Sequence, residues 1–298
     1  WETRIAAAMK LAMLTSEVKT YPWPGAANVK YPLLTVAALQ FNARAYPAIV
    51  QGNRVVKCST WGRDPQGKKA ARGDRVSEFM SYQLLGQQPE WEEDTDRLLI
   101  ILPIVGSCFR KAYYDPSLKR NMTRLVTADR FVVNYWARSL DDVPRTTEEM
   151  RLYPYEIEER IRSGLFVDFK YDSAPADQSA NQPASNKQYS EMDKQAPHLF
   201  LEQHRLLDLD EDGYAEPYIV TVHESTQQVC RIVANFAPDT IKFDDAGKVA
   251  AVRKQQYYVH YQFMPSPDGG FYGLGFGWLT KDIGEAVNAL TNQMLDAG

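Results

Sequence analysis

The segment Asp208–Pro217, DLDEDGYAEP, has residue types and a spacing that suit a divalent cation. Asp208, Asp210 and Asp212 alternate along the chain, and Gly213 follows them. A helix-loop-helix calcium loop places oxygen ligands at positions one, three and five and a glycine at position six. These residues therefore form a candidate site for calcium or another divalent cation.

The rest of the segment departs from a calcium loop. Position twelve should be a bidentate glutamate, but the residue there is Ile219, which lies in a strand pattern. A turn before a strand explains the same residues: aspartate side chains accept backbone N–H groups, and Gly213 adopts a left-handed conformation. We favour the turn and keep cation binding by Asp208, Asp210 and Asp212 as the alternative.

The densest basic stretch contains Arg63, Lys68, Lys69 and Arg72. Lysine and arginine neutralise DNA phosphates, so Lys68, Lys69 and Arg72 are candidate nucleic-acid contacts, with a solvated loop as the alternative. The whole chain has 34 basic and 38 acidic residues and a formal net charge of -4. This balance argues against nucleic-acid binding through a general excess of positive charge.

Catalytic motifs are missing from the sequence. It contains no GxSxG, HExxH or GxxxxGK[ST] pattern, and its four histidines lack a ligand spacing. We therefore expect a protein that is not an enzyme and needs no cofactor. A hydrolase using paired carboxylates is the alternative, and its candidate residues are Asp208, Asp210, Asp212 and Glu216.

A glycine-rich segment precedes the last helical pattern. Its backbone N–H groups could hold a phosphate at a helix N-terminus, but the third glycine of a GxGxxG motif would fall at Trp278. The glycines alternate with aromatic residues, which favours packing between closely approaching backbones. The glycines are Gly269, Gly270, Gly273, Gly275 and Gly277.

The composition is typical of a globular protein. Of 298 residues, 44% are hydrophobic and 24% are charged, so the chain can bury a substantial core. The three widely spaced cysteines, Cys58, Cys108 and Cys230, are predicted to be buried free thiols in a reducing compartment. The strongest apolar run, Leu98–Val105, is too short for a membrane span, which needs ~20 residues.

Helical patterns dominate the first half of the chain. Apolar spacing predicts a helix over 1–16, and a proline at the first position predicts another over 32–46. A third is expected over 74–85, capped by Asp74 and ended by Gly86, and a fourth over 91–102.

Strand patterns follow from Gly106. SCFRKAYYDP and DRFVVNYW carry aromatic and β-branched residues and are separated by a polar turn. After a short helix at 154–163, alternating residues predict a β-rich region over 198–268 with hairpins that turn at 224–228 and 245–247.

Two further segments complete the organisation. Residues 171–197 lack large aliphatic side chains and are predicted to be a polar insertion arm. Residues 279–298 predict the start of a long helix that continues in a longer protein, with an apolar stripe at Ile283, Val287, Leu290, Met294 and Ala297. The predicted class is α+β: helices first, then antiparallel hairpins, then the long helix.

Four segments, taken in order, resemble portal proteins of tailed double-stranded-DNA bacteriophages, in particular those of short-tailed phages. They are PWPGAANVKYPLLTVAALQFNARAYP at 22–47, DRLLIILPIVGSCFRKAYYDP at 96–116, LDLDEDGYAEPYIVTVH at 207–223 and GFYGLGFGWLTKDIGEAVNALTNQMLDAG at 270–298. The resemblance implies a single portal core region over 1–298, mainly the wing.

The resemblance also implies the partners and place of action. A portal subunit joins copies of itself, usually about twelve, in a closed ring at one capsid vertex. Double-stranded DNA passes through the ring without sequence specificity during packaging and ejection, and the ring docks the packaging terminase, tail adaptors and capsid proteins. The expected location is the virion, and the host cytoplasm during assembly, without a membrane. The alternative function is a calcium-binding structural or adhesion module built on the DxDxDG loop.

Overall fold

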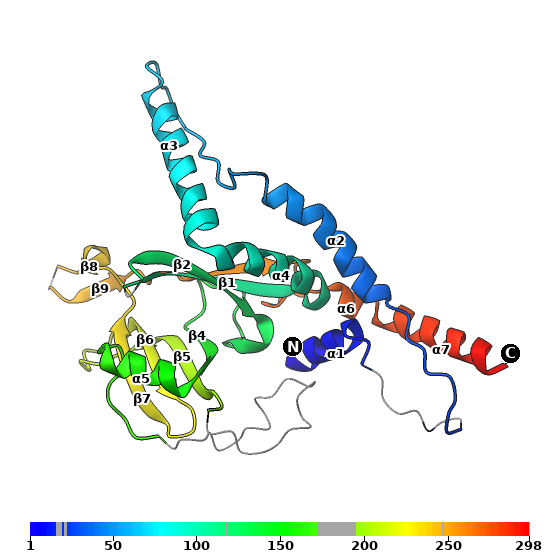
Figure 1. Cartoon of the computed structure of the whole chain (residues 1–298). Coiled ribbons are helices and arrows are strands. Elements are labelled where there is room, and N and C mark those ends of the chain that lie inside the picture. Colours follow the sequence, from blue (N-terminus) through cyan, green and yellow to red (C-terminus); the bar gives the residue numbers. More distant parts are fainter. Residues whose placement is uncertain (16–19, 21–22, 117, 172–194, 246, 298) are drawn as a thin grey trace. The chain divides into compact units, whose positions relative to one another are not determined.

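The structure is a computed structural model that describes residues 1–298 except 16–19, 21–22, 117, 172–194, 246 and 298. Helices and antiparallel sheets occupy different stretches of the chain, so the predicted α+β class is confirmed (Figure 1). The chain forms two compact units. Unit 1 comprises Trp1–Asp129 and Tyr257–Gly298, and unit 2 comprises Arg130–Gln256. A common role for residues 1–298 as one portal core stays a prediction.

Unit 1 contains most of the helices. They are α1 (Glu2–Ala12), α2 (Leu33–Ile49), α3 (Lys68–Tyr82), α4 (Pro89–Val105), α6 (Phe276–Leu279) and α7 (Lys281–Ala297), with a π-helical turn at Gln83–Gln87. Ala8, Leu34, Ala38 and Ile104 form a buried cluster, and Phe276 packs against it. Residues from α1, α2, α4 and α6 thus share one apolar core.

A three-stranded antiparallel sheet completes unit 1, in the order β10-β1-β2. Its strands are β1 (Ser107–Asp115), β2 (Arg120–Thr127) and β10 (Tyr258–Gln262). The prediction of a polar turn after β1 was wrong over most of its length, because RNMTRLVT forms β2. β2 contacts α4 and most of its side chains are half-buried, an environment that polar residues tolerate.

The glycine-rich segment packs closely against the junction of α4 and β1. A Cβ on Gly273 would lie 2.6 Å from the Gly106 carbonyl oxygen, and one on Gly275 would lie 2.6 Å from the Gly106 nitrogen. Close backbone packing therefore explains Gly273 and Gly275, as predicted, whereas a Cβ on Gly269 would have no atom within 4 Å. Gly106 itself has φ 93°, a conformation that favours glycine, and it ends α4 three residues later than predicted.

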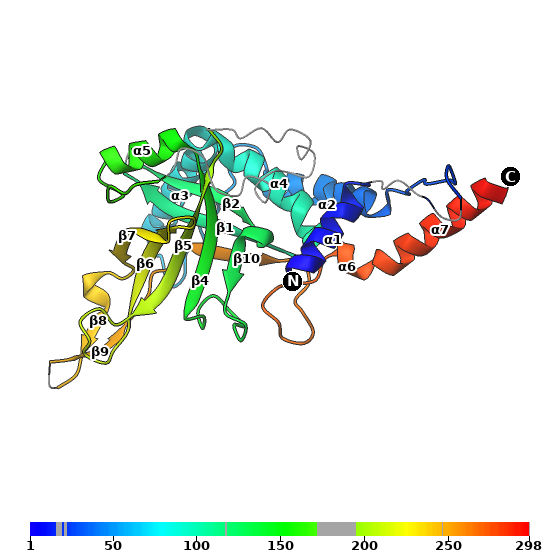
Figure 2. The ribbon, with the colours of Figure 1, turned by 90° about the horizontal axis from the view of Figure 1, so that it is seen from below.

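Unit 2 is built on a five-stranded antiparallel sheet of order β3-β4-β5-β6-β7. Figure 2 shows its central strands side by side. The strands are β3 (Phe131–Val133), β4 (Arg145–Leu152), β5 (His198–Leu207), β6 (Glu216–His223) and β7 (Gln228–Ala234). A separate hairpin joins β8 (Ile241–Phe243) to β9 (Val249–Val252). The β6–β7 and β8–β9 hairpins are confirmed, except that residue 246 of the second turn lies outside the described residues.

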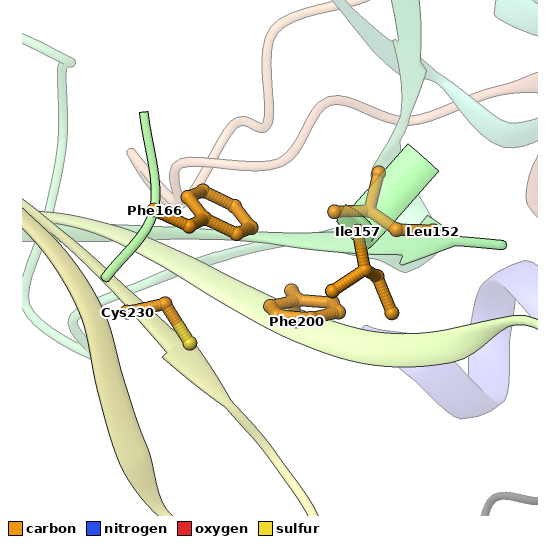
Figure 3. Close-up of a cluster of buried hydrophobic side chains, with 5 residues drawn as sticks. All are labelled: Leu152, Ile157, Phe166, Phe200 and Cys230. Atoms are coloured by element: carbon orange, nitrogen blue, oxygen red, sulfur yellow. The ribbon is translucent and has the colours of Figure 1, made fainter. Parts of the chain in front are cut away.

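Helix α5 (Pro154–Arg162) and the chain after it cover this sheet. Leu152, Ile157, Phe166, Phe200 and Cys230 form the core of unit 2, and Figure 3 shows these side chains lying together. Burial of each large apolar side chain contributes about 1.5–3 kcal/mol. This cluster fixes the sheet that carries the Asp-rich turn.

Helix α3 begins earlier than predicted. Its first residue is Lys68, so Asp74 lies inside the helix and the prediction of an Asp74 cap was wrong. The carboxylate of Asp64 accepts the Ala70 N–H at 2.9 Å and thereby satisfies one of the free N–H groups of the first turn. The extended segment around Val56 runs beside α3, bonded to Ser77 and Ser81 (Figure 1).

Two predicted features have a limited structural description. The polar arm at 171–197 lies mostly outside the described residues, since 172–194 are among the exceptions. Across the part of the chain that the structure describes, no helix has both the length and the hydropathy needed to cross a membrane.

Candidate functional site

The DxDxDG segment is a hydrogen-bonded turn between β5 and β6. Asp208 accepts the N–H of Asp212 at 3.2 Å through Oδ1 and that of Gly213 at 3.0 Å through Oδ2. Glu211 and Gly213 have φ values of 59° and 92°, both left-handed. The predicted turn, with an aspartate accepting N–H groups and a left-handed Gly213, is confirmed.

A second aspartate connects this turn to the neighbouring hairpin. Asp212 Oδ1 accepts the Tyr214 N–H at 2.8 Å. The Tyr214 hydroxyl in turn accepts the Val252 N–H of β9 at 3.0 Å. The aspartates therefore have a structural role in unit 2 that needs no ion.

The three aspartates also converge. One carboxylate oxygen from each of Asp208, Asp210 and Asp212 lies within 4.8 Å of the other two, and all three residues are exposed. These oxygens could supply three ligands to a hard cation such as calcium, with water completing the shell. Ile219, at position twelve, lies buried in β6, so the bidentate ligand of a helix-loop-helix site is missing.

The structure groups the three predicted DNA-contact residues on the first two turns of α3. Lys68, Lys69 and Arg72 are exposed, and their spacings of three and four residues place them on neighbouring positions of one helix surface. The three residues lie in a helix and not in a loop, whereas Arg63 lies in the preceding loop. Because all three are solvent-exposed, the DNA contact and the solvated alternative both stay predictions.

Arg75 extends this basic surface and was not predicted from the sequence. It lies three residues after Arg72 and is exposed. A helix predicted to start at Asp74 would contain Arg75 but not the two lysines. Because α3 starts at Lys68, all of these residues lie on the same helix. The later start was predicted because an aspartate suits a helix N-cap.

Two histidines that the sequence left unconnected meet in the interior of unit 2. His198 Nδ1 lies 3.2 Å from His223 Nε2, and His223 Nδ1 lies 2.8 Å from Thr226 Oγ1. Burial, and secondarily the neighbouring His198, lower the pKa of His223 to about 4. His223 is therefore neutral at neutral pH within this hydrogen-bonded contact.

This histidine pair is not part of a larger ligand cluster. Among the described residues, the only group of three or more His, Cys, Asp or Glu ligands that converge is the aspartate group. Sequence spacing could not reveal the pair because His198 and His223 are 25 residues apart and meet only through the β5–β6 pairing.

His260 has a packing role in unit 1. Its ring packs against both Phe109 and Phe271, with centroid distances of 4.5 Å and 4.6 Å, and those two rings lie 5.9 Å from each other. Burial lowers its pKa to about 4. Its Nε2 lies 3.1 Å from Ser107 Oγ, which also accepts the Gly273 N–H at 2.8 Å. The serine thus links β10 to the glycine-rich segment.

The cysteines are free, as predicted, but only two are buried. Cys108 and Cys230 lie in the interiors of their units, whereas Cys58 is exposed. The prediction of three buried thiols was wrong for Cys58, because it lies in the extended segment beside α3 and not in a sheet.

No protein-family model and no curated protein sequence matches this chain.

Proposed function

We propose that this chain is a portal subunit, which forms a ring at one capsid vertex for DNA packaging and ejection. One observation carries the proposal: three of the four segments that resemble portal proteins build a single packed unit. The described residues of 22–47 and 96–116, together with 270–297, supply α2, α4, β1, α6 and α7 of unit 1. A resemblance spread over distant segments is more specific when those segments pack together.

The surface of α7 also supports assembly with other subunits. Its polar residues Asn288 and Asn292 accept backbone N–H groups of the extended segment 27–31. The predicted apolar stripe faces away from that contact, and Leu290 and Met294 are 62% and 76% exposed. An exposed apolar helix face of this kind marks an interaction surface.

In this proposal unit 1 forms part of the wing, and α3 contributes a sequence-independent DNA contact through Lys68, Lys69 and Arg72. The ring contains about twelve copies closed by rotation. Its further partners are terminase, the tail adaptor and capsid proteins, and its places of action are the virion and, during assembly, the host cytoplasm. The chain acts as a mechanical component and not as an enzyme.

Negative-stain microscopy and mass photometry of the purified chain test the proposal. The expected result is a closed ring of about a dozen copies that persists in EDTA. A chain that remains monomeric at all accessible concentrations, with and without EDTA, contradicts it.

The convergence of three carboxylates within 4.8 Å favours one second candidate, a calcium-binding structural module. It predicts that calcium raises stability by RT ln(1 + [Ca]/Kd), which is about 2.7 kcal/mol at 100 times Kd. Thermal unfolding of the wild type and of Asp210→Asn should then differ in calcium and agree in EDTA. Equal unfolding of the wild type in both conditions excludes this candidate.

A further inference from the structure

An open cavity of about 300 Å³ lies in unit 1 between α1, the start of α2 and α7. Its floor is apolar and includes Leu11, Leu33 and Leu34. Three lysines from three different segments line it, namely Lys10, Lys30 and Lys281, against one acidic lining residue, Glu285. The cavity thus combines an apolar floor with a lining of net positive charge, in which Lys281 Nζ lies 3.9 Å from Glu285 and Lys30 donates to the Thr15 carbonyl oxygen.

Gly284 is an accessible position in the cavity wall. It lies inside α7, lines the cavity, and a Cβ built on it would have no atom within 4 Å. Glycine inside a helix costs about 1 kcal/mol relative to alanine. A side chain placed at this position therefore meets open space and extends from the cavity wall without a clash.

The Asp-rich turn of unit 2 has the complementary character. Leu209 lies between Asp208 and Asp210 and is 53% exposed, and Glu211 and Asp212 follow it. Four carboxylates therefore surround one exposed apolar side chain. We call residues 208–212 the acidic loop.

We propose that the acidic loop of one copy docks in the α1–α2–α7 cavity of the next copy. Leu209 would contact the apolar floor, while the flanking carboxylates would face the three lysines. Opposite charges across an interface select the partner and its register, and an apolar side chain in a desolvated pocket supplies binding energy.

A contact between two different surfaces is the kind from which a ring is built. The loop belongs to unit 2 and the cavity to unit 1, so two different surfaces meet, and a joined pair still has one free loop and one free cavity. Such a heterologous contact propagates from copy to copy and closes if the rotation permits. The inference rests on the proposed ring and assigns one of its contacts.

Cysteine cross-linking tests the contact directly. In a Cys58→Ser background of the full chain, Leu209→Cys and Gly284→Cys are combined and oxidised. We expect a ladder of disulfide-linked multimers on a non-reducing gel. The matched control replaces Leu209→Cys by Asp239→Cys, another exposed position of unit 2, and should yield no ladder.

A charge exchange tests the electrostatic part. Asp210→Lys alone and Lys281→Glu alone should each raise the concentration needed for half-assembly about tenfold, because like charges then face each other. The double variant should recover most of the wild-type assembly. A merely local effect of either substitution on folding would not be rescued by the other.

The outcomes separate this inference from the proposed function. Wild-type rings without the ladder and without charge rescue overturn the contact and leave the portal proposal standing; the cavity then has another occupant. A cross-link confined within single chains overturns the contact as well. Disulfide-linked chains that never close into rings support the proposed contact and count against the proposed portal function. A monomer without any cross-link overturns the contact and the portal function.

Discussion

Asn292 of α7 bonds to both backbone groups of Val29. Its Oδ1 accepts the Val29 N–H at 2.7 Å, and its Nδ2 donates to the Val29 carbonyl oxygen at 3.1 Å. Asn288 and Asp296, one turn away on either side, accept the N–H groups of Tyr31 and Ala27, both at 2.7 Å. Three side chains on one helix face thus provide the hydrogen-bond partners that a neighbouring strand would give to an extended segment.

Replacing Asn292 by alanine should destabilise unit 1 by about 1–3 kcal/mol, because two hydrogen bonds to the Val29 backbone are lost and each contributes about 0.5–1.5 kcal/mol. Urea unfolding measures the change. Gln293→Ala is the matched control on the same helix, where the exposed side chain predicts a change within about 0.5 kcal/mol. Equal effects of the two substitutions would contradict the role of Asn292.

Two glycines of the last segment should respond to alanine in opposite directions. A Cβ on Gly277 would lie 2.7 Å from the Ile104 carbonyl oxygen and closer still to Ala8, so Gly277→Ala should cost about 1–3 kcal/mol. Gly284→Ala meets open space inside α7 and should stabilise by about 1 kcal/mol. Thermal unfolding of both variants checks the prediction, and a shift of the same sign would refute it.

Acidification should destabilise both units between about pH 6.5 and pH 4. The pKa values of His223 and His260 are lowered to about 4, so the unfolded chain binds more protons in this range. Stability therefore falls as pH decreases, by about 2 kcal/mol per histidine between pH 7 and pH 5. Urea unfolding at a series of pH values measures this slope.

His223→Phe should reduce the pH slope of unit 2, since the buried group that must gain a proton is removed. Thr226→Val is the control: it removes the hydroxyl that lies 2.8 Å from His223 Nδ1 but retains both buried histidines. It should lower stability while keeping the slope. An unchanged slope in His223→Phe would show that other groups cause the pH dependence.

The basic surface of α3 should bind DNA without sequence preference. Replacing Lys68, Lys69 and Arg72 by glutamine should weaken binding, because these side chains no longer neutralise phosphates. The slope of log Kobs against log salt should decrease by about 0.9 for each phosphate that is no longer neutralised. Fluorescence anisotropy with two unrelated duplexes measures both quantities.

A control with the same change of charge replaces Lys242, Lys248 and Arg253, which are exposed on and beside the β8–β9 hairpin. It should leave binding within about twofold of wild type after correction for net charge. Equal weakening in the two triple variants would indicate that overall charge, and not the α3 surface, determines binding.

The elements that follow a simple periodicity were predictable. The helices at 91–102 and 154–163 and the two hairpins were found because apolar spacing and turn residues act locally. β2 and β4 were not found, since RNMTRLVT and RTTEEMRL have mostly polar side chains. Glu148 is buried in β4 although its residue type favours the surface, and only the neighbouring strands β3 and β5 make that position internal.

The candidate sites divide in the same way. The turn at Asp208–Gly213 was predicted because its hydrogen bonds join residues at most five apart. The His198–His223 contact and the α1–α2–α7 cavity were not predicted, because each is formed by residues that are distant in sequence.

The sequence by itself determined the α+β class, the turn at the acidic loop and the amphipathic pattern of α7, since local hydrogen bonding and side-chain periodicity are encoded over a few residues. Only the tertiary structure decided which face of α7 packs within the unit. The stripe pattern alone would bury Leu290 and Met294, yet Asn292 bonds to Val29 and the stripe is exposed. The physical reason is that an unpaired extended backbone needs hydrogen-bond partners, which apolar side chains cannot provide.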